Sequence, residues 1–310
     1  MSQIINGRWD TTSNRDFMKA GILSKIFDDT DTKALVYYKQ LVNDKTSKDE
    51  WIRHGKIAGL TYPGSLADGQ NIPVQTVPGP QTKTYTLGRW GTGFRVTAWQ
   101  EKYNKFDQTQ RLTRSLKKCM AEGKDVEIHR MFNNPTVSTY AGTGFDGQVL
   151  AYATHTGLLS GSTDDNYDNI LSVTPSYSAL ASVRYYYKTA KNDMGQLMGM
   201  DPDVLVFEPT QWPTWMEILN SGKLAFEMSN TESPWKNYIK PVEDPRLTST
   251  TAWFTLSKKD DNFDLNVFTG QEPDFFMKDA PDNTRDRVAT SEQHFTYGFG
   301  QPKAYLCGNV

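Results

Sequence analysis

The stretch from Asp107 to Phe132 constrains the fold most, because it predicts a single long helix. Asp107 and Gln110 can form a reciprocal cap at its start, and the pattern stops at Asn133-Asn134-Pro135. Apolar or small residues recur at helical spacing along one stripe: Leu112, Leu116, Cys119, Met120 and Gly123. About 26 residues at 1.5 Å each give a helix of roughly 40 Å, far above the average of about 11–12 residues. We expect this helix to be the spine of a domain.

The residues before this helix predict an N-terminal arm and then an extended β-hairpin. Residues 1–54 hold short apolar clusters among polar residues, which predicts an arm with one or two short helices. From residue 55, prolines and glycines separate short runs, and Thr82–Leu87 and Gly93–Ala98 alternate apolar and polar residues as strands do. Few residues are left to cover such a hairpin, so we expect residues 55–104 to reach away from the body.

The residues after the helix predict a mixed region of helices and strands. A glycine-rich turn at 142–147 precedes a strand-like run, Gln148–Thr154, and helical patterns follow at Tyr177–Asp193 and from Trp212 to Gly222. Asp203–Phe207 has the continuous apolar run of a central strand. Further strands are predicted at Tyr238–Val242, Trp253–Leu256 and Phe263–Phe268, and in the tail, where Phe295, Tyr297 and Phe299 share one face before Lys303–Cys307. The predicted fold class is therefore α+β.

Charge, cysteine content and hydropathy exclude several protein classes. The 310 residues carry 34 Lys and Arg against 36 Asp and Glu, which argues against a general nucleic-acid-binding polycation and leaves room for a local basic patch. Cys119 and Cys307 are too far apart in sequence for a disulfide framework or a metal knuckle, which fits synthesis in a reducing cytosol. No signal-peptide core and no run of about 18 apolar residues occurs, so no membrane partner is expected.

No motif predicts catalysis, a cofactor or a metal ion. Gly142–Gly147 matches the GxGxxG string, but a strand-like run rather than a helix follows it, so a plain turn is the simpler interpretation. The acidic pairs Asp164-Asp165 and Asp260-Asp261 lie in polar loops and are expected to be solvated, and Cys119 is expected in the core. The four histidines, His54, His129, His155 and His294, are scattered and form no ligand motif, and His155 and His294 are expected to be structural. A nucleotide-dependent enzyme built on the Gly142 turn stays an alternative.

The order of these parts resembles the tailed-phage major capsid proteins of the Hong Kong 97 type. In that family an arm, a long two-stranded loop, a spine helix, a strand pair, an αβ domain and a closing strand follow one another. Three stretches resemble motifs of its Mu-like branch of major head proteins: Phe145-Asp-Gly-Gln-Val-Leu-Ala-Tyr-Ala-Thr-His-Thr-Gly157, Pro202-Asp-Val-Leu-Val-Phe-Glu-Pro209, and Asn237–Leu247 with Ala252–Leu256. The resemblance in order covers residues 50–305.

The resemblance implies a major capsid protein, without catalytic activity, that self-assembles into the icosahedral shell around phage double-stranded DNA. It implies a peripheral domain at residues 105–175, an axial domain at 176–290 and closing strands of the peripheral domain at 291–310. The implied partners are further copies in hexamers and pentamers, a separate scaffolding protein, a portal, a decoration protein in some shells, and packaged DNA contacted non-specifically. The implied location is the virion, after synthesis in the host bacterial cytoplasm. A tail-tube subunit, expected to lack the spine helix, stays a second alternative.

Four residues of the predicted hairpin are the candidate contacts to a neighbouring copy. Arg89 and Trp90 are expected at the second turn of the hairpin, and Trp and Arg contribute most to binding at protein interfaces. Tyr85 and Phe94 are aromatic residues on the flanking strands. A purely intramolecular role for Trp90, packed within its own hairpin, stays open.

Overall fold

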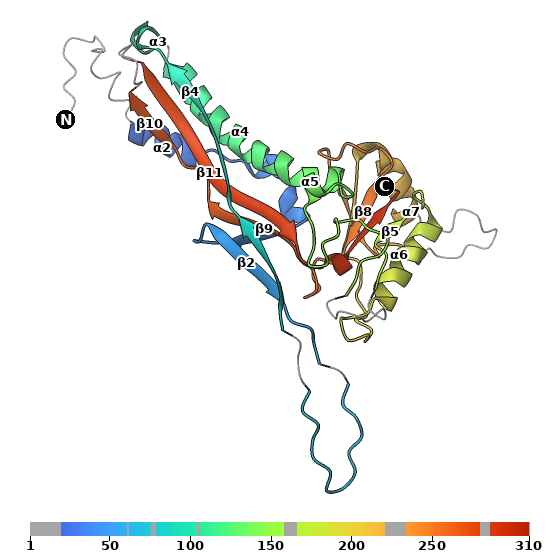
Figure 1. The fold of residues 1–310 in the computed structure, drawn as a ribbon. Coiled ribbons are helices and arrows are strands. Elements are labelled where there is room, and N and C mark those ends of the chain that lie inside the picture. Colours follow the sequence, from blue (N-terminus) through green and yellow to red (C-terminus); the bar gives the residue numbers. More distant parts are fainter. Residues whose placement is uncertain are drawn as a thin grey trace.

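The computed structural model describes residues 20–60, 62–75, 79–103, 106–157, 166–220, 234–279 and 286–309. Within them two five-stranded sheets lie side by side, and a two-stranded sheet stands at the base of a long loop that projects from the body (Figure 1). One hydrophobic core continues from the first sheet, with Leu265 and Phe299, to the second, with Trp253 and Leu306. The predicted α+β fold class is confirmed. Residues 1–19 of the predicted arm and the pair Asp164-Asp165 lie outside the described residues.

The helix α4 (Phe106–Asn133) is the predicted spine, and it lies along the first sheet (Figure 1). Its 28 residues extend the predicted span by one residue at each end. The buried face agrees with only part of the predicted stripe, since Leu116 and Met120 are buried. The remaining members of that stripe are exposed: Leu112, Cys119 and Gly123. The expectation of Cys119 in the core is therefore wrong.

Polar side chains complete the buried face of α4. Thr113 donates its hydroxyl to the carbonyl of Thr109 at 2.9 Å, and the ammonium of Lys124 donates to Oγ1 of Thr269 at 2.8 Å. Each of these groups is buried and hydrogen-bonded, so its burial carries little penalty. A search for apolar residues at helical spacing does not detect buried polar residues. The predicted stripe is therefore rotated around the helix relative to the face that packs on the sheet.

The first sheet has the strand order β1-β9-β11-β10, with β4 paired to β11 outside this path. β1 is parallel to β9, and the other pairs are antiparallel. The alternation predicted for the tail is present in β11, where Phe295 and Phe299 are buried and Tyr297 is half-buried. The strands are β1 (Asn43–Thr46), β4 (Gly88–Val96), β9 (Leu265–Gln271), β10 (Phe276–Asp279) and β11 (Arg287–Phe299).

The described part of the arm is packed against the spine helix. α2 (Ala20–Asp28) contacts α4, with Leu23 and Phe27 buried. The ammonium of Lys117 lies 4.5 Å from the centre of the Phe27 ring. Two short 3-10 turns follow, η1 (Lys33–Leu35) and η2 (Tyr38–Gln40). The short helices expected in the arm are therefore present.

The second sheet has the strand order β5-β12-β8-β6-β7. Its buried strands β6 and β8 and its flanking helices lie close to the predicted positions, because continuous apolar runs and helical periods mark them in the sequence. The strands are β5 (Ile170–Leu171), β6 (Val204–Phe207), β7 (Lys240–Glu243), β8 (Trp253–Leu256) and β12 (Tyr305–Gly308). The helices are α6 (Tyr177–Thr189) and α7 (Trp212–Asn220), with the shorter α3 (Ala98–Tyr103), α5 (Ser138–Ala141), η3 (Pro209–Gln211) and η4 (Pro302–Ala304) elsewhere.

Sheet membership differs from the predicted domain boundaries. β9 and β10 belong to the first sheet although the predicted axial domain runs to residue 290, and β12 belongs to the second sheet although residues 291–310 are predicted to close the peripheral domain. The predicted strand Gln148–Thr154 is also wrong, since these residues form an irregular segment in which Leu150 and Ala151 are buried. Apolar patterns indicate burial, whereas strand partners depend on contacts between distant segments.

A buried polar cluster joins the arm, α4 and the loop after β7. The carboxylate of Asp125 accepts hydrogen bonds from the backbone N–H groups of Tyr37 and Tyr38, both at 2.9 Å. It also accepts one from Nε of Arg246 at 3.1 Å. One turn further along α4, His129 lies against Asp244. Three segments that are distant in the sequence are thereby held in one arrangement.

Candidate assembly surfaces

The projecting loop, defined as the described residues between Lys56 and Gln81, connects β2 (Trp51–Lys56) to β3 (Gln81–Thr86) (Figure 1). Its large apolar side chains are exposed, Val74 by 94% and Tyr62 by 71%. Other members of this set are Ile57, Leu60, Leu66 and Ile72. Monomeric proteins rarely expose such a concentration of apolar side chains, which makes this loop a candidate interaction site. The only signal for this loop in the sequence is a set of apolar residues among prolines and glycines, which follow neither a helical nor a strand period.

The base of the projecting loop is attached to the body by polar contacts. Nε2 of His54 on β2 donates to Oδ1 of Asp264 at 2.6 Å. Lys56 donates to the side-chain oxygens of Asn262 at 3.3 Å and Gln301 at 3.1 Å. Burial alone would raise the pKa of Asp264, but the hydrogen bond and charge of His54, with hydrogen bonds from Asn266 and the Gln301 backbone, lower it. The loop therefore leaves the body from a fixed base.

Tyr85, one of the predicted contact residues, is buried within its own subunit. Its hydroxyl donates to the carbonyl of Phe299 at 2.6 Å, and burial raises its pKa. A Cβ at Gly298 would overlap the Tyr85 ring, so the close approach of β3 and β11 requires glycine there. On the same strand, Lys83 donates to Thr143 at 2.8 Å. Tyr85 thus fixes β3 to the first sheet instead of facing a neighbour.

The predicted turn at Arg89 and Trp90 is wrong, because both residues lie inside β4. β3 pairs with β2, whereas β4 pairs with β11 in the register Trp90↔Gln293 and Arg89↔His294. Alternation alone does not tell which of several strands are partners, and the two runs interpreted as one hairpin belong to different sheets. The residue positions on the strand nevertheless leave both side chains at the surface.

Arg89 forms a two-pronged ion pair with Glu292 on β11. Its Nε and one terminal nitrogen bond to the two carboxylate oxygens, the latter at 2.6 Å. His294 donates to the same carboxylate at 2.6 Å. The hydrogen bonds from Arg89 and His294 lower the pKa of Glu292 to about 2. The guanidinium is mostly exposed, so it is free on its outer side to meet a partner.

Trp90 stacks on Phe295, with ring centres 5.4 Å apart and an interplanar angle of 21°. The Trp90 side chain is 40% exposed, and Phe94 on the same face of β4 is half-buried. The structure therefore shows intramolecular packing for Trp90 together with an exposed edge. The four predicted residues do not form one patch: Tyr85 is internal, and Arg89 lies on the opposite face of β4 from Trp90 and Phe94.

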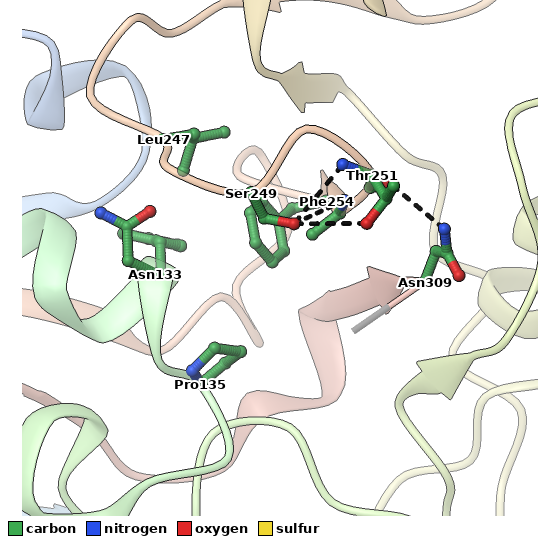
Figure 2. A pocket seen from close by; sticks show the side chains of 9 residues that line it. Asn133, Pro135, Leu247, Ser249, Thr251, Phe254 and Asn309 are labelled. Carbon is green, nitrogen blue, oxygen red and sulfur yellow. Dashed lines mark hydrogen bonds between the residues drawn. The ribbon is translucent and has the colours of Figure 1, made fainter.

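A small cavity of about 180 Å³ lies between the end of α4 and the second sheet (Figure 2). Its polar side chains already have partners: Asn133 donates to the carbonyl of Arg246 and accepts from the N–H of Thr248, both at 3.0 Å. None of its lining residues is ionisable: Phe132, Asn133, Pro135, Leu247, Ser249, Thr251, Ala252, Phe254 and Asn309. The cavity offers no acid, base or charged group for catalysis.

The glycine-rich segment 142–147 is the expected plain turn. Gly142 and Gly147 have φ values of 75° and 77°, and the N–H of Gly144 donates to the carbonyl of Gln148 at 2.7 Å. No helix begins at residues 142–157, and the next helix among the described residues is α6 at Tyr177. The phosphate-binding geometry of a dinucleotide site needs a helix N-terminus directly after the glycines. This arrangement therefore disfavours the nucleotide alternative.

Each histidine of the chain lies against a carboxylate. The pairs are His54–Asp264, His129–Asp244, His155–Asp146 and His294–Glu292. His155 is fully buried, donates to Asp146 at 2.7 Å and stacks on Tyr167. These two residues are the Asp and the His of the motif at residues 145–157. Such pairs fit the structural role expected of His155 and His294.

In the described part of the chain, no three His, Cys, Asp or Glu side chains are grouped so that they could hold a metal ion. No described helix is both long and apolar enough to cross a bilayer. Of the acidic pair Asp260-Asp261, Asp260 accepts from the backbone and side chain of Asn262, at 2.8 and 2.7 Å, and Asp261 is exposed.

Comparison with known proteins gives one family and a consistent fold. A family model described as "Phage capsid protein" matches residues 80–307. No curated protein matches the sequence. Among solved structures, the capsid of cyanophage P-SCSP1u is 11% identical with a TM-score of 0.60, covering 88% of this chain and 87% of that chain.

Two further structures share the fold. The capsid of cyanophage Pam1 is 11% identical with a TM-score of 0.54, over 90% of this chain and 92% of that chain. An encapsulin from Synechococcus elongatus is 9% identical with a TM-score of 0.53, over 91% of this chain and 89% of that chain. At these identities the structures establish the shared fold, and the family rests on the family model.

Proposed function

The chain belongs to the phage capsid protein family, and from this premise we propose that its projecting loop lies across a neighbouring copy in the hexamers and pentamers of an icosahedral shell. The chain is a major capsid protein with the Hong Kong 97-type α+β fold, and it forms the shell by self-association. Its place is the virion. Closed shells arise when each copy uses several different patches whose rotations close.

The exposed apolar side chains of the projecting loop carry this proposal. Full burial of one such side chain contributes about 1.5–3 kcal/mol, and their own subunit leaves them in solvent. The loop is held at its base by His54 and Tyr85, so it is presented at a fixed place. Each contact can be weak, because simultaneous engagement of several patches multiplies the affinity.

The finer partners follow from the same proposal. A separate scaffolding protein and a portal assist assembly, a decoration protein is a further candidate, and packaged double-stranded DNA is contacted non-specifically. Synthesis takes place in the host bacterial cytoplasm. The first sheet with α4 corresponds to the peripheral domain, and the second sheet with α6 and α7 to the axial domain. Membership of the Mu-like branch stays a prediction.

The two alternative functions have less support. A tail-tube subunit is expected to lack a spine helix, whereas α4 has 28 residues. A nucleotide-dependent enzyme would need a helix at the Gly142 turn, and it would be stabilised by its cofactor. We propose that the chain acts by association and not by catalysis, and we expect no change of Tm when nucleotides are added.

The test removes the apolar character of the projecting loop without touching its base. In Ile57→Ser/Leu60→Ser/Tyr62→Ser, we expect a folded, monodisperse subunit that forms no shells, because all three side chains are exposed in the subunit. The matched control is Ser65→Ala/Asp68→Asn in the same loop, which should assemble as the wild type does. Shells at wild-type yield from the triple variant would contradict the proposed role of the loop.

A further inference from the structure

A basic stripe lies on the exposed side of the amino-terminal half of α4. From Gln108 to Ala121 this helix has four basic residues and no acidic one, whereas the whole chain has a net charge of −2. Arg111, Arg114 and Lys118 are exposed. Their spacing of three and four residues puts them on one stripe, opposite the buried positions Thr113, Leu116 and Met120.

We propose that this stripe, Arg111, Arg114 and Lys118, binds the phosphate backbone of double-stranded DNA. The inference rests on the proposed function, in which the shell encloses DNA, and it adds the surface that meets the DNA. The stripe covers about 10 Å of helix, since seven residues separate its ends at 1.5 Å each. Double-stranded DNA presents a negative charge about every 1.7 Å of its axis, so several phosphates face a stripe of this length.

The basic side chains of the stripe have no ion-pair partner within the described part of the subunit. No carboxylate there forms an ion pair with Arg111, Arg114 or Lys118. Other surface cations do have such partners, as in Arg89–Glu292 and Lys188–Asp201. Like charges three and four residues apart destabilise a helix. Since none of the three cations is in such a pair, the stripe is open to an anion outside the subunit.

The neighbouring residues define the ends of the surface. Lys117 lies beside the stripe and is held over the Phe27 ring of α2 at 4.5 Å, so it is not counted in it. Glu122, one turn after Lys118, is the next side chain on the same side of α4 and ends the basic stretch. Arginine and lysine on a helix surface contact phosphates without reading bases, so the binding is independent of DNA sequence.

The experiment measures DNA binding by the purified, unassembled full-length chain as a function of salt. Fluorescence anisotropy of a labelled duplex gives the slope of log Kobs against log salt, whose magnitude is about 0.9 per phosphate contact. For Arg111→Gln/Arg114→Gln/Lys118→Gln we expect this slope to fall by about 2.7, and by about 0.9 in Arg114→Gln alone. Gln has nearly the helix propensity of Arg and Lys, so the helix should be retained.

The controls separate this inference from the proposed function. Lys236→Gln/Lys240→Gln/Lys278→Gln removes the same charge from exposed positions elsewhere and should leave the slope as in the wild type. Shell formation, followed by electron microscopy, tests the proposed function and should be unaffected by the stripe variant. An unchanged slope in the stripe variant would overturn the inference. So would a variant that keeps its DNA binding and instead loses binding to a co-expressed scaffolding protein.

Discussion

Nε2 of His129 lies 2.8 Å from Oδ2 of Asp244, and this contact joins the spine helix to the second sheet in a site almost closed to solvent. Nδ1 of the same ring donates to the carbonyl of Asp125 at 2.6 Å. Burial alone would lower the pKa of His129, but the hydrogen bond and charge of Asp244, together with Asp125, raise it. Protonation of the ring is therefore favoured in the folded state, and the ring links two parts of the fold.

His129→Gln should destabilise the subunit by about 3–5 kcal/mol, the cost of removing one partner of a buried pair. Because the pKa of His129 is raised in the folded state, its stabilisation is fully present below an unfolded pKa of about 6.5 and is lost as the pH rises through the folded pKa. Urea unfolding of both proteins from pH 5.5 to 9 checks this. The difference in the free energy of unfolding should be largest at acid pH, and a difference that does not change with pH would contradict this role of His129.

Asp264→Asn should loosen the base of the projecting loop. Loss of a hydrogen bond to a charged group costs about 1.5–3 kcal/mol at pH 7. The pKa of Asp264 is lowered, so its stabilisation is present above an unfolded value of about 3.9 and disappears as the pH falls through the folded value. Hydrogen exchange of Trp51–Lys56 should accelerate in the variant at pH 7. The control is Asp261→Asn, an exposed acid nearby, which should behave as the wild type.

Thiol labelling tests which face of α4 packs on the sheet. Cys119 is exposed, whereas Cys307 is fully buried in β12 and burial raises its pKa. A maleimide should therefore modify Cys119 within minutes in the native chain and reach Cys307 only after unfolding. Mass spectrometry of the labelled peptides gives the answer directly. Protection of Cys119 in the unassembled subunit would place the predicted apolar stripe, and not the observed face, against the sheet.

Trp90→Asp should leave a soluble, folded subunit that does not form shells. The substitution removes the stacking on Phe295, worth about 0.5–1.5 kcal/mol, at a side chain that is 40% exposed. It also places a charge at the surface proposed to meet a neighbour. Circular dichroism and electron microscopy distinguish folding from assembly, and Trp90→Phe is the matched control. Closed shells at wild-type yield from Trp90→Asp would refute the interface role of this residue.

The sequence predicted the elements of this fold better than their partners. α4 and the buried strand β8 were recognisable because a helical period and a continuous apolar run are local properties. The pairing of β4 with β11, which are about two hundred residues apart in the sequence, could not be recognised, since many strands have compatible alternation. The exposure of Cys119 was missed because Thr113 and Lys124, which are polar, occupy the buried face.

The candidate site was predicted in part. The hairpin region was predicted to contact a neighbouring copy, and this stays a prediction. Tyr85 is internal, because its hydroxyl donates to the Phe299 carbonyl of a distant strand. The exposed apolar residues of the projecting loop, such as Tyr62 and Val74, had no period to mark them. These residues are candidate contacts because their side chains are exposed, and that exposure is known only from the folded structure.

Electron microscopy of the purified protein, expressed alone and then with the neighbouring genes of its genome, tests the central claim most directly. A shell-forming protein should give closed polyhedral particles, or sheets of pentamers and hexamers, in at least one of the two preparations. Straight tubes would instead indicate a tail component. A monodisperse monomer, even with a scaffolding candidate present, would contradict the account.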